Sequence, residues 1–361
     1  MERTTHRNRR LWFLVPGDLE TPTGGYRYGR RILEGLRTLR WEVEHRALDG
    51  SFPFPSRKAL ERAAGLLSGI PDRETVVVDG LAFGALPEVA ESHGQHLGLI
   101  ALVHHPLWLE TGLDPRRAES LRVSETRALA RARRVIVTSP ATARLLQDHG
   151  VPADRIRVVT PGVDPAPAAT GSAGPDLQLL CVATLTPRKG HDVLLRALAP
   201  LAPLPWHLHC VGSLDRDRHW AAELLRLRRD LGLDERVSFT GALGQAELDQ
   251  RYVQSDLFVL PTRFEGYGMV VAEALARGLP LVVTRTGALP DLVTPRAGIL
   301  VPPEEPAALG DALGRLIANA GLRQQLAAGS RAAGLRLPTW TDAAREFAAA
   351  CRQIQGGDVH G

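Results

Sequence analysis

The stretch that decides the fold is residues 256–273, DLFVLPTRFEGYGMVVAE, in which an apolar run, a loop and a second apolar run follow one another. The first five residues have the length and composition of a buried strand. The loop contains a proline and two glycines, and the apolar residues after it predict a helix over 268–277. A strand that ends in such a loop before a helix is typical of parallel α/β sheets, which bind ligands at the carboxyl ends of their strands.

Two glutamates, Glu265 and Glu273, stand eight positions apart across this loop. If the whole segment were helical, they would start about 12 Å apart along the axis and point about 80° apart, so they could not meet on one small group. With Glu265 in the loop, Gly266 and Gly268 allow it to fold back over the helix start, and both carboxylates can face one elongated ligand. Carboxylates repel phosphate and accept hydrogen bonds from hydroxyls, which predicts a ligand with sugar or ribose hydroxyls. A solvent-facing Glu273 stays an alternative, although its apolar helix neighbours predict burial and therefore a polar partner.

Length and composition are those of a globular protein with two domains. The chain has 361 residues, 44% of them hydrophobic, which is enough for two cores. Its cysteines, Cys181, Cys210 and Cys351, lie far apart, which excludes a disulfide framework and a cysteine-based zinc site and indicates a reducing compartment. We find no signal peptide and no stretch long enough to span a membrane, and we expect a cytoplasmic protein.

The positive charge comes almost entirely from arginine. The formal net charge is +4, and the only lysines are Lys58 and Lys189. Arginine clusters at 7–10, 131–134 and 226–229 could face anionic lipid, which keeps peripheral contact with the inner face of a membrane open, although such clusters are more often solvated helix faces. No stacking aromatic residues are interleaved with them, which argues against nucleic acid as a partner.

Strands and helices alternate along the chain in two series. The first predicts strands over 11–15, 75–78, 97–103, 135–137 and 156–160 and helices over 27–39 and 140–149. The second predicts strands over 177–182, 207–211, 237–240, 256–260 and 281–284 and helices over 191–199, 220–232, 245–254 and 268–277. Residues 161–175 predict a linker between the series, and a last helix is expected over 342–355. The fold class predicted is therefore α/β, with two Rossmann-like parallel-sheet domains that face each other across a cleft.

Two glycines and two cations are candidates for phosphate binding. Gly24 and Gly25 precede the first expected helix, so their N–H groups could face a phosphate, although a plain turn is the more common outcome. Arg188 and Lys189 follow the first strand of the second series, where a bidentate guanidinium and an ammonium suit a diphosphate; a solvated loop is the alternative. The G-x-G-x-x-G fingerprint of dinucleotide enzymes is absent. With two cations available no metal is required, and we expect no metal and no cofactor apart from a co-substrate.

His104 and His105 end the strand expected over 97–103. A histidine at this edge could donate to a reacting hydroxyl or relay its proton. Adjacent residues of an extended chain point to opposite sides, so at most one of the two is expected in a site, and a structural role is the alternative.

Together these residues resemble those of the retaining glycosyltransferases of family four, which have the GT-B fold. The resemblance covers nearly the whole chain and rests above all on the Glu-x7-Glu spacing of Glu265 and Glu273. The other matching segments are 103–105, 137–140, 158–164, 187–190, 241, 260–262, 274–276 and 278–280.

This resemblance implies a nucleotide-sugar site in the second domain. Glu273 would hold the ribose hydroxyls, Glu265 the hydroxyls of the transferred sugar, and Lys189 the diphosphate, with Arg188 near it. His104 would contact the sugar near its anomeric carbon. The remaining residues implied in donor binding are Gly24, Gly25, Gly266, Tyr267, Gly268, Met269 and Val270.

The resemblance also implies a division of the chain and a mechanism. The expected ranges are an acceptor-binding domain over 1–165, a nucleotide-sugar-binding domain over 175–340, and a helix over 341–361 that packs back toward the first domain. Transfer would retain the anomeric configuration through front-face attack, with the leaving diphosphate helping to deprotonate the acceptor. Stabilisation of that diphosphate would then be the main catalytic effect.

The chain departs from the family pattern at three places. Ala183 and Thr184 replace a frequent Gly-Arg pair, Gly287 and Ala288 replace a frequent Gly-Gly pair, and His105 replaces an aspartate. Since the missing arginine is a usual diphosphate partner, we expect Arg188 to compensate for it.

The predicted function is metal-independent, retaining hexosyl transfer from a UDP- or GDP-linked sugar to a hydroxyl acceptor in glycan, glycolipid or polysaccharide biosynthesis. A sugar-nucleotide epimerase on the same fold and a catalytically silent sugar-nucleotide-binding partner stay open. The sequence leaves the sugar, the base and the acceptor undecided, and a lipid-linked acceptor stays open. Loops 49–56 and 107–117 are expected to decide the acceptor, with Trp108 and Leu109 either lining an apolar acceptor site or packing in the core.

Overall fold

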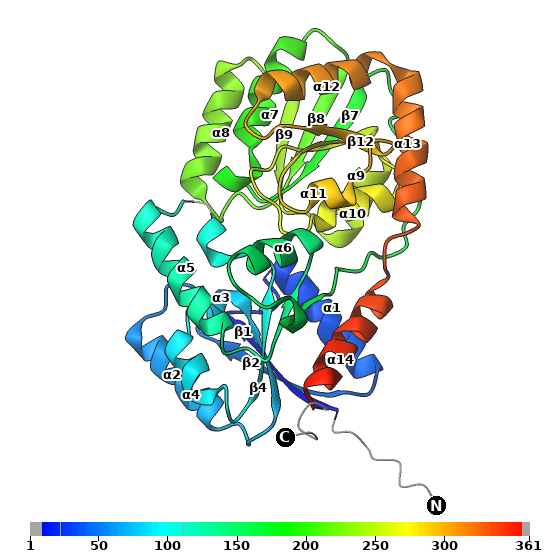
Figure 1. The fold of residues 1–361 in the computed structure, drawn as a ribbon. Helices are drawn as coiled ribbons and strands as arrows, with labels where there is room; N and C mark the ends of the chain where they lie inside the picture. Colours follow the sequence, from blue (N-terminus) through cyan, green and yellow to red (C-terminus); the bar gives the residue numbers. More distant parts are fainter. Residues whose placement is uncertain (1–8, 22, 111, 356–361) are drawn as a thin grey trace, which may run out of the picture. The chain divides into compact units, whose positions relative to one another are not determined.

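The computed structural model describes residues 9–21, 23–110 and 112–355, and Figure 1 shows its ribbon. The chain separates into two compact units. The first ends at Gly162 and resumes at Pro338, and the second spans Val163–Leu337. Each unit contains one six-stranded sheet whose paired strands are parallel. The linker predicted over 161–175 contains no helix or strand and overlaps the start of the second unit.

The sheet of unit 1 has the strand order β2-β1-β3-β4-β5-β6. Its strands are β1 (Arg10–Pro16), β2 (Glu42–Leu48), β3 (Thr75–Asp79), β4 (Gly98–Val103), β5 (Arg134–Val137) and β6 (Ile156–Val158). The chain moves outward from β1 to β2 and then returns to the other side of β1 to form β3. This reversal is a topological switch point, and open α/β sheets bind ligands beyond the carboxyl ends of the strands at such a point.

The helices of unit 1 pack around this sheet. They are α1 (Gly24–Thr38), α2 (Arg57–Ser68), α3 (Gly80–Phe83), α4 (Pro87–His93), α5 (Pro115–Leu129), α6 (Pro140–Asp148) and α14 (Trp340–Gln355). The terminal helix α14 lies alongside α1 (Figure 1). Their approach is close at Gly35, where a Cβ atom would lie only 2.4 Å from the Cβ of Ala344. Glycine is therefore required at this contact. Residues 356–361 of the expected last helix lie outside the described residues.

The sheet of unit 2 has the strand order β12-β11-β10-β7-β8-β9. Its strands are β7 (Leu177–Val182), β8 (Trp206–Val211), β9 (Val237–Gly241), β10 (Leu257–Leu260), β11 (Leu281–Thr284) and β12 (Gly298–Val301). Counted from β7, this is the 3-2-1-4-5-6 order of the dinucleotide-binding fold. The switch point lies between β7 and β10, which are neighbours in space and far apart in sequence.

The helices of unit 2 follow its strands in alternation. They are α7 (His191–Leu198), α8 (Arg218–Asp230), α9 (Gln245–Val253), α10 (Met269–Ala276), α11 (Leu289–Leu292), α12 (Pro306–Ala318) and α13 (Ala320–Gly334). The prediction of an α/β fold with two parallel sheets is confirmed.

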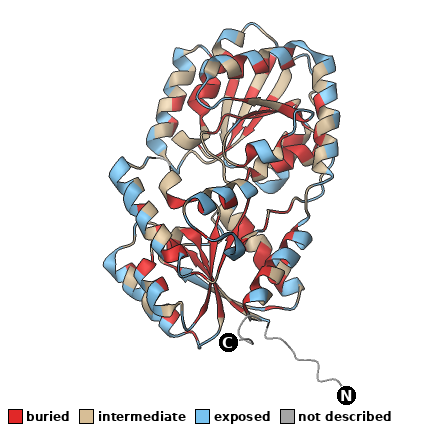
Figure 2. Cartoon of the chain, viewed as in Figure 1, coloured by how far each residue is buried: buried red, intermediate tan, exposed pale blue. Residues whose placement is uncertain are grey.

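Buried residues gather on the strands of each unit (Figure 2). Strands β3, β4, β5, β10 and β11 are buried along their whole length, as expected for parallel strands covered on both faces. All three cysteines are buried and free, which confirms that the chain has no disulfide framework. Within the part of the chain that the structure describes, no helix is long and apolar enough to cross a membrane.

Candidate functional site

The switch point of unit 2 brings two loops together. One leads from β7 to α7 and ends in Lys189, and the other leads from β10 to α10 and contains Glu265. The Lys189 Nζ atom lies 2.6 Å from Glu265 Oε2, and the two side chains are only 13% and 14% exposed. Two residues that are 76 positions apart therefore form a half-buried ion pair at the carboxyl edge of the sheet. The sequence had placed both residues in one site without predicting that they touch.

Glycines shape the loop that holds Glu265. Helix α10 begins at Met269, so Glu265 is in the loop and not in the helix. Its N-cap Gly268 has a φ of 95°, and a Cβ atom there would lie 3.6 Å from Glu265 Cγ. Glu265 thus folds back over the helix start, in the conformation that the sequence requires if both glutamates are to face one ligand.

The backbone of Glu265 is itself tightly packed. Its carbonyl accepts a hydrogen bond from Ala288 N at 2.9 Å. A Cβ atom on Gly287 would lie 2.0 Å from the same carbonyl oxygen, so no larger residue fits there. Of the two positions where the family often has glycine, the one that the packing requires to be glycine has kept it.

Glu273 lies on α10 and is 7% exposed. Its Oε2 accepts a hydrogen bond from the hydroxyl of Tyr252 at 3.0 Å. The burial and the polar partner predicted for this carboxylate are both confirmed. Arg277, one turn further along the same helix, lies over the Tyr252 ring and pairs with Asp249, so the tyrosine is held in place from a second side.

Arg263 joins the two loops, and the sequence analysis missed it. Its guanidinium donates to both oxygens of Asp192 at 3.1 and 3.0 Å, to the Pro187 carbonyl, and through Nε to Glu304 at 2.8 Å. Its backbone N–H donates to the Arg188 carbonyl at 2.7 Å. Each of these contacts fixes the segment before Lys189 relative to the segment before Glu265. The pattern PTRFEGYG offered no signal for this role, because Asp192 and Glu304 are distant in sequence.

Burial and charge act in opposite directions at this site. Burial lowers the pKa of the Lys189 ammonium, and the Glu265 carboxylate opposes that shift. At Asp192, burial raises the pKa, but hydrogen bonds and charges from Arg263 and Arg196 outweigh it and leave the pKa lowered. The edge of the sheet thus holds ionised groups of both signs at short distances.

Arg188 lies next to Lys189, and its Nη1 donates to the Phe264 carbonyl at 3.1 Å. This contact draws Arg188 toward the loop of Glu265. In the first turn of α10, the N–H groups of Met269 and Val270 come before the first N–H that bonds within the turn, from Val271 to the Gly268 carbonyl. Such N-terminal groups can bind an anion.

The switch point of unit 1 brings together three other residues predicted from the sequence or beside it. His104 follows β4, and its Nε2 lies 3.3 Å from Oδ2 of the buried Asp79 at the end of β3, at ion-pair distance but without hydrogen-bond geometry. A Cβ atom on Gly25 would lie 3.3 Å from His104 Cδ2. The paired glycines are the first two residues of α1, after the N-cap Thr23, and do not precede the helix as expected. Asp79 was not predicted.

The loop after β4 is held by a buried acid. Glu125 on α5 is 1% exposed, and its Oε2 accepts a hydrogen bond from Leu107 N at 2.8 Å, while its Oε1 has no hydrogen-bond partner among the described residues. Burial raises the pKa of this carboxyl to about 8. His105 contacts Glu110 at 3.0 Å, and the Trp108 ring packs against His149, with ring centres 4.8 Å apart.

The predicted basic clusters differ from one another. Arg7 of the first cluster lies outside the described residues. In the second, Arg134 begins a strand and is buried, so that segment is not a uniform basic surface. Among the residues that the structure describes, no group of three or more His, Cys, Asp or Glu side chains could hold a metal ion.

Solved structures similar to this one show which fold it is. Sucrose-phosphate synthase from Thermosynechococcus elongatus matches with a TM-score of 0.81 at 22% identity, covering 96% of this chain and 99% of that one. The chain has the GT-B fold. Another GT-B structure, Anabaena Alr3699/HepE in complex with UDP-glucose, matches with a TM-score of 0.77 at 20% identity, covering 95% of this chain and 99% of the other.

Two family models match within this GT-B chain. Residues 176–319 match the model described as "Glycosyl transferases group 1", and residues 77–167 match "Glycosyltransferase Family 4". The first match includes the loops of both Lys189 and Glu265. Both descriptions support a glycosyltransferase.

Relatives are similar over part of their length. A D-inositol 3-phosphate glycosyltransferase from Acidothermus cellulolyticus is 34% identical over 233 residues, which cover 59% of this chain and 52% of the relative. An MMP alpha-(1->4)-mannosyltransferase from Mycolicibacterium hassiacum is 27% identical over 315 residues, which cover 82% of this chain and 75% of the relative. The alignment thus spans about half the length of the first of these relatives.

Proposed function

We propose that this chain is a glycosyltransferase that moves a hexosyl unit from a UDP- or GDP-linked sugar to a hydroxyl acceptor, with retention and without a metal. The observation that supports this most is the Lys189–Glu265 pair at the switch point of unit 2, with Glu273 on the helix that follows. A cation next to two carboxylates matches a ligand with phosphate on one part and hydroxyls on another. The family matches and the titles of UDP-bound similar structures point to the same donor class.

The proposed roles follow from charge and position. Lys189 would hold the diphosphate together with Arg188 and the N–H groups at the start of α10. An ammonium has three donors, so Lys189 can bond a phosphate oxygen and keep its contact with Glu265. Glu265 would accept from hydroxyls of the transferred sugar, and Glu273, oriented by Tyr252, from the ribose hydroxyls.

The same groups account for the chemistry. As the bond from the anomeric carbon to the diphosphate breaks, negative charge grows on the departing oxygens. Fixed cations stabilise that charge more than they stabilise the bound donor, because they are oriented in advance and partly withdrawn from water. For unit 1 we propose that His104 and the Gly25 amide contact the donor, with Asp79 positioning the imidazole.

A thermal-shift panel of UDP- and GDP-linked sugars tests this proposal. One of them should raise the melting temperature of the wild-type chain, because a ligand that binds only the folded state stabilises it. Lys189→Ala should abolish the shift, whereas Lys58→Ala, which removes the only other lysine, an exposed one on α2, should retain it. No shift with any nucleotide sugar, or an unchanged shift in Lys189→Ala, would refute the proposal.

Activity with the donor so identified separates the proposal from its alternatives. Product that forms only when a hydroxyl acceptor is added indicates transfer. An altered nucleotide sugar without acceptor would indicate an epimerase, and saturable binding without turnover would indicate a silent binding partner.

A further inference from the structure

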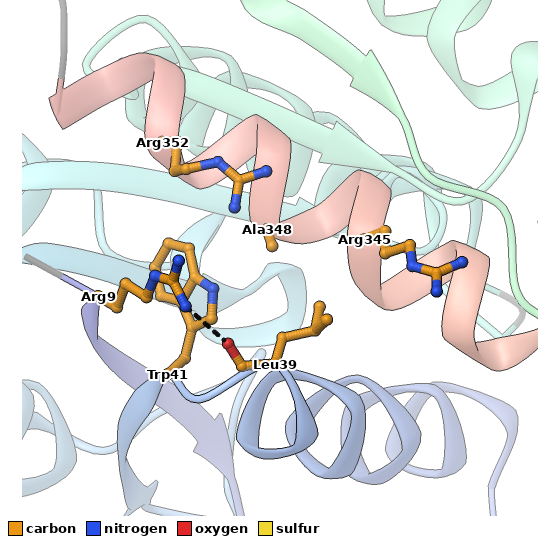
Figure 3. A pocket seen from close by; sticks show the side chains of 6 residues that line it. All are labelled: Arg9, Leu39, Trp41, Arg345, Ala348 and Arg352. Carbon is orange, nitrogen blue, oxygen red and sulfur yellow. Dashed lines mark hydrogen bonds between the residues drawn. The ribbon is translucent and has the colours of Figure 1, made fainter. Parts of the chain in front are cut away.

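A second candidate site lies at the opposite edge of the unit 1 sheet. A cavity of about 160 Å³ is lined by Arg9, Leu39, Trp41, Arg345, Ala348 and Arg352 (Figure 3). Arg9 directly precedes β1 and Trp41 directly precedes β2, so the cavity lies at the amino ends of these parallel strands. His104 follows the carboxyl end of β4, which places the cavity away from the switch point of this sheet.

The fold builds this cavity from three separate segments. Positions 345, 348 and 352 are spaced by three and four residues and therefore share one face of α14. The close contact of Gly35 with Ala344 holds α14 against α1, which brings that face to the end of α1. There the chain turns through Arg40, whose φ of 61° is unusual for a residue other than glycine. This turn is closed by a hydrogen bond from Trp41 N to the Leu36 carbonyl at 3.0 Å.

The lining is strongly cationic. Three of its six residues are arginines, and none is acidic. Arg9 donates to the Leu39 carbonyl at 3.2 Å, and Arg345 pairs with Asp342 at 3.3 Å, so two of the three side chains are anchored at the rim. A guanidinium has five N–H donors, and these contacts leave most of them available. In Figure 3 the guanidinium groups of Arg9 and Arg352 both lie near Trp41, and Arg345 lies further along α14.

We propose that this cavity binds an anion of the phosphate class, either free phosphate or a phosphate ester. Like charges that line one hollow repel each other, and a bound oxyanion removes that cost. Two guanidinium groups over a buried indole match the donor pattern and the low local dielectric that favour a phosphate. The site does not depend on the proposed glycosyl transfer, because it shares no residue with the loops of Lys189 and Glu265.

Calorimetric titration of the full chain with inorganic phosphate, at constant ionic strength, tests the site. Lys189→Ala protein should still bind one phosphate per chain, since the competing candidate in unit 2 has been removed. The double variant Arg9→Gln, Arg352→Gln should weaken this binding roughly tenfold or more. The matched control is Arg226→Gln, Arg229→Gln, which removes two exposed charges from α8 and should bind phosphate like the parent.

Three results would overturn the proposal: no saturable phosphate binding, loss of binding in Lys189→Ala alone, or equal losses in both double variants. Flotation with phosphatidylcholine vesicles, with and without phosphatidic acid, separates the two sources of phosphate. Capture only by phosphatidic acid vesicles that needs Arg9 and Arg352 would assign a lipid headgroup. Phosphate binding without capture would assign a soluble phosphate.

Discussion

The loops at the two switch points are held together by different forces. In unit 2 they are joined by ion pairs, Lys189 with Glu265 and Arg263 with Asp192. In unit 1 the loop after β4 is held by a buried acid that accepts one backbone hydrogen bond, Glu125 from Leu107 N, and by the Thr138 hydroxyl, which donates to the His104 carbonyl at 3.3 Å.

This difference indicates what each edge can bind. Fixed charges of both signs prepare the unit 2 edge for a ligand that has both phosphates and hydroxyls. The unit 1 edge offers an imidazole, a carboxylate and a helix start, which suit a polar group but supply no lysine or arginine to a diphosphate. Strong donor binding should therefore depend on unit 2.

The largest effect is expected for Lys189→Ala. It removes the cation from the diphosphate and leaves the Glu265 carboxylate half-buried and without its ammonium. We expect transfer to fall roughly 100- to 1,000-fold, the range seen when one preorganised charge-stabilising group is lost. Steady-state kinetics with the donor found by thermal shift measure this, with Lys58→Ala as control. A loss below tenfold would break the comparison, because donor binding would then not depend on the unit 2 ion pair.

Glu125→Gln tests the uncharged anchor of unit 1. The pKa of Glu125 is about 8 in the folded chain against 4.5 as the ordinary value, so the folded state keeps a proton that the unfolded state releases between these values. The free energy of unfolding of the wild type should therefore fall as pH rises through this window, by roughly 1.4 kcal/mol per unit at most.

The glutamine variant lacks this dependence. Its stability relative to wild type should rise by a few kcal/mol from pH 5 to pH 8. Urea unfolding at several pH values measures the difference, and Glu88→Gln, which changes an exposed acid on α4, is the control. A difference that does not change with pH would show that Glu125 is ionised and that unit 1 is also held by charge.

Arg263→Lys tests whether geometry as well as charge joins the unit 2 loops. Lysine keeps the positive charge but cannot reproduce the forked contacts to Asp192, Pro187 and Glu304. We expect donor affinity to fall about tenfold, and amide exchange to become faster in segments 186–190 and 262–268. Arg285→Lys provides an exposed control in the same unit. Unchanged exchange in both segments would assign Arg263 no positioning role.

The smallest effect on binding is expected for His104→Gln in unit 1. Since the diphosphate contacts proposed here belong to unit 2, donor affinity should change less than about threefold, while turnover decreases through loss of the proposed contact near the anomeric carbon. Titration and steady-state kinetics on the same preparation separate the two quantities. A large loss of donor affinity would mean that unit 1 contributes as much to donor binding as unit 2.

Buried elements could be predicted from the sequence, and exposed ones could not. Strands such as 177–182 and 281–284 were predicted at their observed bounds because parallel strands covered on both faces are continuous apolar runs. Strand β2 was missed because its residues Glu42, Glu44, His45 and Arg46 are polar, as an edge strand permits. Strand β12 and helices such as α2, α12 and α13 were also missed.

The site residues divide in a similar way. Local pattern was enough to single out Lys189, Glu265 and Glu273, and the apolar surroundings of Glu273 required a partner. Which residue supplies it, Tyr252, depends on how α9 packs against α10, and no local pattern contains that information. The Lys189–Glu265 contact and the role of Arg263 likewise depend on strand order, because β7 and β10 become neighbours only when the sheet reverses.

Hydrogen–deuterium exchange with and without a nucleotide sugar tests the central claim most directly, since it locates the ligand without assuming the acceptor. We predict slower exchange in segments 186–190 and 262–273 of the wild-type chain when the donor is present, and no such change in Lys189→Ala. Slower exchange confined to other segments, or an equal change in Lys189→Ala, would contradict the assignment of donor binding to the switch point of unit 2.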